Sequence, residues 1–141
     1  LAPNIDAGGL HILNGINKFK DEHKMDNLFI LNHIPHDIFV NLMRNTKCMV
    51  GNSSSGIRET CYFGVPTVNI GTRQQKRERS TNVLDAPYER NGIHDAIVSQ
   101  INHGRYVPEF LYGDGASGAR IANILANIDL SKIEIQKTIT Y

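Results

Sequence analysis

The stretch Gly51-Asn52-Ser53-Ser54-Ser55-Gly56-Ile57-Arg58-Glu59 stands between an apolar run, Cys48-Met49-Val50, and a helical pattern, Thr60 to Phe63. A strand, a tight Gly/Ser turn and a helix start together form a site where an anion can bind. Backbone N–H groups and the positive helix end point at the turn, and small side chains let a phosphate approach closely. Glu59 lies about one turn into the helix, where a carboxylate can accept hydrogen bonds from a ribose diol.

Helical patterns alternate with short apolar runs along the rest of the chain, which predicts an α/β domain with a doubly wound, Rossmann-like parallel sheet. The expected strands are Leu28–Leu31, Cys48–Val50, Val65–Ile70 and Val83–Leu84. The expected helices carry Leu10 to Phe19, Ile38 to Met43 after Pro35, Ser55 to Phe63 before Gly64, Ile93 to Ile101 capped by Asn91, and Ile121 to Ile128.

Ligands of such sheets bind at the carboxyl ends of the strands. Four loops are expected to open on that edge, namely Pro3–Gly9, Asn32–Pro35, Gly51–Gly56 and Gly71–Arg79. We expect residues 1–130 to form one nucleotide-binding domain. Residues 131–141 form a C-terminal tail whose alternating apolar residues suit either a strand or a frayed end.

Composition narrows the class of protein. The chain has 141 residues, 15 basic and 14 acidic side chains and a net charge of +1, which argues against a nucleic-acid-binding surface. No apolar run approaches the roughly 20 residues of a membrane span. Cys48 and Cys61 resemble buried hydrophobic residues, which favours a reducing, cytoplasmic setting. The chain opens on Leu1 and reads as a piece of a longer polypeptide.

Four blocks in order carry a resemblance to a known family: Pro3 to Gly8; His33-Ile34-Pro35; Gly51 to Glu59; and Gly71-Thr72-Arg73-Gln74 with Arg77, Asn82 and Val83. A fifth, weaker block is Tyr112 to Gly115. The chain resembles the C-terminal half of the UDP-N-acetylglucosamine 2-epimerases, most closely their hydrolysing branch. The resemblance spans nearly the whole chain.

The resemblance implies one half of a two-domain, glycosyltransferase-B-like fold with UDP between the halves. Carried over by position, Ser53, Ser54 and Glu59 hold the diphosphate and ribose, and Arg73 faces the diphosphate. Asn4 lies beside the nucleotide, and Ile34 meets the uracil, partly through its backbone. An arginine suits a diphosphate because its planar fork can donate two parallel hydrogen bonds.

The implied reaction eliminates UDP across sugar carbons 1 and 2 and hydrates the intermediate to N-acetylmannosamine, for sialic-acid synthesis. Arg73 would stabilise the leaving diphosphate. The family's candidate bases for removing the proton at carbon 2 lie in the missing N-terminal half, so this chain alone should not catalyse the reaction. The resemblance implies no cofactor, a UDP-sugar substrate, the missing domain of the same polypeptide and a homo-oligomer as partners. Lys76 is a departure, because relatives often have glycine there.

Other interpretations stand beside these. The Gly51–Glu59 stretch could be an ordinary strand-to-helix turn with serine caps. Arg58 suits a structural role better than a ligand role, and Lys76 and Arg79 are expected in solvent. His33 and His36 lack the carboxylates or cysteines that would complete a metal site. The alternative functions are a glycosyltransferase of the same fold, a non-hydrolysing 2-epimerase and a nucleotide-sugar-binding module without catalysis.

Overall fold

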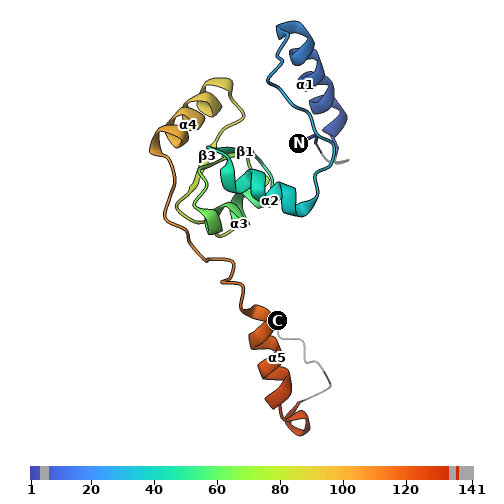
Figure 1. The fold of residues 1–141 in the computed structure, drawn as a ribbon, viewed down its shortest axis with the longest axis vertical. Coiled ribbons are helices and arrows are strands. Elements are labelled where there is room, and N and C mark those ends of the chain that lie inside the picture. The colour runs from blue at the N-terminus through green and yellow to red at the C-terminus, as the bar shows by residue number, and fades with distance from the viewer. Residues whose placement is uncertain (4–6, 134–135, 137–141) are drawn as a thin grey trace. The chain divides into compact units, whose positions relative to one another are not determined.

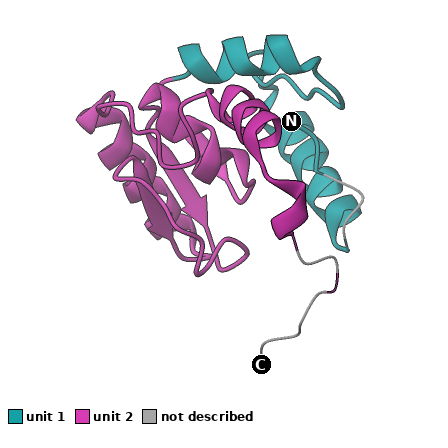
Figure 2. Cartoon of the chain, turned by 90° about the horizontal axis from the view of Figure 1, so that it is seen from below, with its two compact units in different colours: residues 1–46 teal, residues 47–141 magenta. Residues whose placement is uncertain are grey.

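The computed structural model describes residues 1–3, 7–133 and 136. The described chain divides into two compact units, residues 1–46 and residues 47–141 (Figure 2). Each unit is described by itself below, with its elements labelled as in Figure 1.

The first unit holds two helices, α1 (Gly9–His23) and α2 (His36–Asn45). Both form where the apolar spacing predicted them, and Pro35 directly precedes α2 as its N-cap. The prediction of a strand at Leu28–Leu31 was wrong. That run makes one backbone hydrogen bond with another segment, from the Ala2 N–H to the Leu31 oxygen, and pairs with no strand among the described residues. An apolar run needs a neighbouring strand to become part of a ladder.

The second unit is built on a parallel sheet of three strands in the order β1 (Met49–Gly51), β2 (Thr67–Ile70) and β3 (Val83–Ala86). The register aligns Gly51 with Asn69 and Asn69 with Asp85, so these residues form one row across the sheet. β2 begins two residues later than the expected Val65. Pro66 has no N–H to give a ladder, although its oxygen accepts from the Met49 N–H at 2.8 Å.

Helices cover both faces of this sheet, which confirms the doubly wound α/β class (Figure 1). On one face, Val68 and Ala86 form an apolar core with Ala96 of α4 (Arg90–His103). Contacts on the other sheet side come from α3 (Ser55–Arg58), where a side-chain carbon built on Gly56 would meet the Thr67 methyl at 3.1 Å.

The helix expected over Ser55–Phe63 is present but changes type. After α3 the chain tightens into the 3-10 helix η1 (Thr60–Phe63), and Gly64 ends it as predicted, with φ of 61°. The expected cap of α4 was wrong by two residues, because the helix already begins at Arg90 with Glu89 at its N-cap. Of the four apolar residues expected in α4, Ile93 and Ile97 pack on the core, whereas Val98 and Ile101 are exposed.

Two short elements close the described chain, α5 (Ser117–Asn127) and η2 (Leu130–Lys132). Asp114 lies in the turn before α5, between Gly113 and Gly115. It accepts hydrogen bonds from Arg120 and from the Ala116 N–H, and these bonds lower the pKa of Asp114 to about 2. Most of the tail, for which a strand and a frayed end were both open, lies outside the described residues. None of the described helices has the length and apolar character that crossing a membrane requires.

Candidate functional site

The Gly51–Gly56 turn leaves β1 at the carboxyl edge of the sheet and leads into α3. The first helical bonds run from the Gly56 N–H to the Ser53 oxygen at 3.2 Å and from the Ile57 N–H to the Ser54 oxygen at 3.0 Å. The N–H groups of Ser53 and Ser54 have no hydrogen-bond partner among the residues that the structure describes. The turn therefore presents two adjacent backbone donors, which is what an anion requires.

The helix after the turn is shorter than expected, since α3 has four residues before the 3-10 turn. A dipole that builds up over aligned peptides is correspondingly small here. Attraction for an anion at this turn thus depends on the individual N–H groups and on nearby side chains. Two serines already organise the turn: Ser53 Oγ accepts from the Ser55 N–H, and the Ser55 hydroxyl donates to Glu59 Oε1 at 3.2 Å.

The Gly71–Arg79 loop lies against this turn, as expected for two loops on one sheet edge. Arg73 Nη1 donates to the Asn52 oxygen at 3.2 Å, and Gln74 Nε2 donates to the same oxygen at 2.8 Å. Arg73 is exposed, whereas Gln74 is only 2% exposed. The guanidinium expected to face a diphosphate is therefore placed at the turn that offers the backbone donors.

Arg79 was expected in solvent, and the structure corrects that expectation. Its guanidinium donates to both carboxylate oxygens of Asp85 at 2.5 Å and to the Gln74 backbone oxygen at 2.7 Å. Asp85 also accepts from the Asn69 amide nitrogen at 2.7 Å. Because opposite charges attract strongly at this distance, Arg79 fastens the loop to the sheet instead of extending into water. Lys76 is exposed, as expected.

Sequence reasoning missed the polar residues that support this edge. Asn69 and Asp85 sit near the ends of neighbouring parallel strands, and Gln74 belongs to the Gly71–Gln74 block without having been given a role. A polar residue at the carboxyl end of an otherwise apolar strand was the available signal for the first two.

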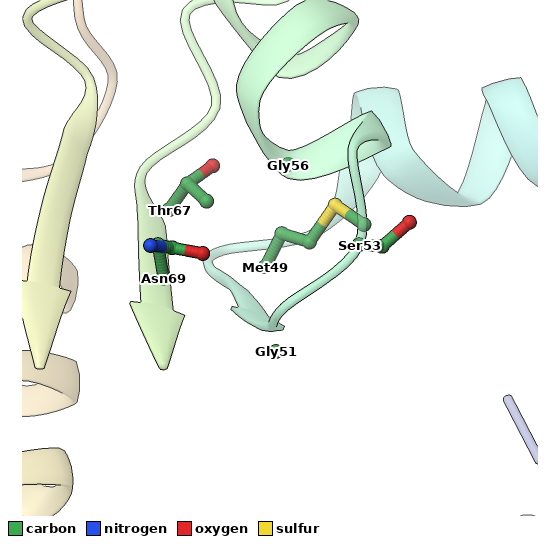
Figure 3. Close-up of a pocket in the computed structure, with 6 residues that line it drawn as sticks. All are labelled: Met49, Gly51, Ser53, Gly56, Thr67 and Asn69. Carbon is green, nitrogen blue, oxygen red and sulfur yellow. The ribbon is translucent and has the colours of Figure 1, made fainter. Parts of the chain in front are cut away.

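A small hollow opens between the turn and β2. Six residues line it: Met49, Gly51, Ser53, Gly56, Thr67 and Asn69. In Figure 3 the Asn69 amide oxygen points toward the hollow while its nitrogen points toward β3. Asp85 fixes this orientation, because a carboxylate accepts and only the amide nitrogen can donate to it. That leaves Asn69 Oδ1 buried and without a partner in the described chain.

The remaining predicted residues fall in different places. Ile34 is half-buried just before α2 in the first unit, and Asn4 lies outside the described residues. Arg58 is exposed, and its guanidinium lies over the Tyr112 ring, 5.5 Å from the ring centre, which agrees with the structural role favoured from the sequence. Burial raises the pKa of both Cys48 and Cys61, so both are thiols at neutral pH and poor nucleophiles.

The fold and this edge together define a doubly wound α/β domain whose first strand ends in a turn with two available backbone donors. Residues 2–126 match the family model described as UDP-N-acetylglucosamine 2-epimerase. The chain belongs to this family, whose overall fold is of the glycosyltransferase-B-like type. Membership confirms the resemblance drawn from the five blocks.

Three relatives illustrate the match. The chain is 32% identical, over 96% of its length, to a UDP-N-acetylglucosamine 2-epimerase of Neisseria meningitidis. It is 33% identical, over its full length, to a hydrolysing UDP-N,N'-diacetylbacillosamine 2-epimerase of Legionella pneumophila. It is 34% identical, over 72% of its length, to the polysialic acid biosynthesis protein P7 of Escherichia coli. The chain spans only 36% and 37% of the length of the first two relatives.

Proposed function

We propose that this chain is the UDP-binding half of a hydrolysing UDP-N-acetylglucosamine 2-epimerase that makes N-acetylmannosamine and UDP for sialic-acid-type sugar synthesis. The observation that carries the proposal is the placement of Arg73 beside the Ser53–Ser54 turn in a member of this epimerase family. The names of the Legionella and Escherichia relatives favour the hydrolysing branch and the sialic-acid role.

In this proposal the diphosphate lies on the turn. The Ser53 and Ser54 N–H groups donate to it, and Arg73 adds a positive charge. Charge on the diphosphate increases as the bond to sugar carbon 1 breaks, so donors already in position stabilise the transition state more than the bound substrate. Glu59 accepts hydrogen bonds from the ribose, Ile34 contacts the uracil, and Asn4 lies beside the nucleotide.

The rest of the proposed enzyme lies outside this chain. The base that removes the proton at carbon 2 and most of the sugar pocket belong to an N-terminal domain of the same polypeptide. The complete protein works in the cytoplasm as a homo-oligomer, without a metal or organic cofactor. Residues 1–130 form its nucleotide-binding domain, and residues 131–141 its tail.

The reaction is tested with the complete polypeptide and UDP-N-acetylglucosamine in heavy water, followed by NMR. We expect UDP together with free N-acetylmannosamine that carries deuterium at carbon 2, because the carbon accepts a solvent proton during hydration. UDP-N-acetylmannosamine in equilibrium with substrate would instead assign the non-hydrolysing branch. Transfer of the sugar to an added acceptor, with no free mannosamine, would assign a glycosyltransferase.

The site is tested by UDP affinity of variants of the same polypeptide. Arg73→Ala should weaken UDP binding roughly 10- to 100-fold and Glu59→Ala about tenfold, since each removes a hydrogen bond that involves a charged group. Lys47→Ala is the matched control, because Lys47 is exposed and precedes β1 at the opposite edge of the sheet. Unchanged UDP affinity in both site variants would refute the assignment.

A further inference from the structure

The Asn52 carbonyl receives two donors of very different character. Gln74 Nε2 and Arg73 Nη1 both donate to the Asn52 oxygen, at 2.8 and 3.2 Å. Gln74 is 2% exposed, so its bond is shielded from water, whereas Arg73 is exposed and its bond is longer. A hydrogen bond weakens with length and with competition from water. The Gln74 bond is thus the permanent one, and the Arg73 bond is the one that can be exchanged.

Chemistry fixes the orientation of the Gln74 amide. A carbonyl oxygen only accepts, so the amide nitrogen must face Asn52 and the amide oxygen must face away. Gln74 Oε1 is then buried without a partner among the described residues. Burying half of an amide unsatisfied is unfavourable for folding, and an apolar side chain of the same size would avoid it. What Gln74 contributes at this position is therefore the hydrogen bond that its amide nitrogen donates to the Asn52 oxygen.

The carbonyl that Gln74 holds is next to the two free donors of the turn. The peptide bond between Asn52 and Ser53 is planar, so its C=O and N–H point in opposite directions. A donor fixed on the Asn52 oxygen therefore also fixes the direction of the Ser53 N–H.

We propose that Gln74 is a positioning residue, which holds the Asn52 carbonyl so that Arg73 can leave that carbonyl and bind the diphosphate. The inference rests on the proposed function, in which a diphosphate occupies the turn. Without Gln74, Arg73 would be the donor left on the Asn52 oxygen, and its bond to the ligand would compete with that role. Gln74 thus acts on the ligand through Arg73 and through the Ser53 N–H, and does not contact the ligand itself.

The test is a double-mutant cycle in the complete polypeptide, with UDP and uridine affinities measured by calorimetry. Gln74→Leu should weaken UDP binding about tenfold and leave uridine binding unchanged, because only the diphosphate interacts with Arg73. In an Arg73→Ala background, Gln74→Leu should cause a much smaller further loss. Gln75→Leu is the matched control: it is the same substitution one residue along, at an exposed position, and should change neither affinity.

Several results would overturn the proposal. Unchanged UDP affinity in Gln74→Leu would remove the role altogether. An equal loss of uridine and UDP affinity would indicate general disruption, and losses that simply add would show that Gln74 acts independently of Arg73. Should Gln74→Leu fail to fold, Gln74→Met, which is unbranched and adaptable, takes its place with the same expectations. Absence of UDP binding in the unmutated protein would refute the proposed function itself, and this is measured first.

Discussion

Lys76 has a backbone conformation that its side chain disfavours. Its φ is 64°, in the left-handed region, where a side-chain carbon crowds the following carbonyl. Lys76 makes no hydrogen bond or ion pair among the described residues and is exposed, so nothing local offsets the strain. A lysine in place of the glycine that the resemblance implies thus has a structural consequence: the Gly71–Arg79 loop keeps its turn, and the Lys76 backbone is strained.

We therefore predict that Lys76→Gly stabilises the protein. Relief of left-handed strain is about 1 to 2 kcal/mol, and the extra freedom of glycine in the unfolded chain costs about 0.5 to 1 kcal/mol. The expected net gain is about 0.5 to 1 kcal/mol in the free energy of unfolding, measured by urea denaturation. Lys76→Ala is the control, because it removes the charge but keeps the strain; equal effects of the two variants would refute the explanation.

At the scale of elements, Asn82 joins the strands to the helices behind them. It is 1% exposed, and its amide nitrogen donates to Thr60 Oγ1 at 3.0 Å and to the Val65 oxygen at 2.7 Å. Its backbone oxygen accepts from the Gln100 amide at 3.0 Å, and that amide also binds the Thr67 oxygen. The network connects β2, η1, the start of β3 and α4. Asn82 belongs to a block shared with the family, yet these bonds are structural.

Asn82→Leu should therefore destabilise the protein by about 2 to 4 kcal/mol, because it removes the amide donor from the buried Val65 oxygen and Thr60 hydroxyl. The Thr67 hydroxyl reaches both acceptors, but its single hydrogen can satisfy only one of them at a time. Tyr106→Phe removes a single bond at the edge of the same network, from the tyrosine hydroxyl to Gln100 Oε1 at 2.8 Å, and should cost about 1 kcal/mol. Urea unfolding measures both. A selective loss of UDP affinity in folded Asn82→Leu, without loss of stability, would contradict the structural role.

The elements show which features of the fold could be predicted from sequence. Strand–turn–helix order around Gly51–Gly56 was predictable, because apolar runs and small turn residues are local signals. The absence of a strand at Leu28–Leu31 could not be predicted, since strand pairing depends on a neighbour that the local sequence does not reveal. The start of α4 was misplaced because Asn91 is a good cap by residue type, whereas the chain enters the helix from an extended Glu89, with φ of −124° and ψ of 134°.

The residues of the candidate site also divide into those that the sequence could predict and those that it could not. Arg73 could be proposed from the residues and the family pattern together, and the structure places it at the turn. Arg79 could not be told from a solvated charge, because its partners Asp85 and Gln74 meet it only through the sheet register and the loop path. The sequence of a charged loop does not reveal which of its residues forms an ion pair. The supporting residues of a site are thus harder to predict than those that follow a motif.

At the scale of the whole molecule, the carboxylates of Glu59 and Asp85, beside the turn and the loop, are both engaged in hydrogen bonds. Glu59 accepts the Ser55 hydroxyl, and Asp85 is paired with Arg79 and Asn69. Removal of a proton from a sugar carbon requires a base within reach of that proton and ready to accept it. Neither of these two carboxylates is arranged in this way, which agrees with the proposed division of labour, in which this half binds UDP and the other half supplies the base.

The division predicts that residues 1–141 alone release no UDP from UDP-N-acetylglucosamine, whereas the complete polypeptide does. NMR of the UDP resonances follows both samples under the same conditions, with circular dichroism to verify that the isolated chain is folded. Glu59→Gln and Asp85→Asn, made in the isolated chain, serve as controls for any residual turnover. Turnover by residues 1–141 that disappears in either variant would place the base in this half and overturn the division. Its absence in a folded sample would mean that the second domain supplies part of the chemistry.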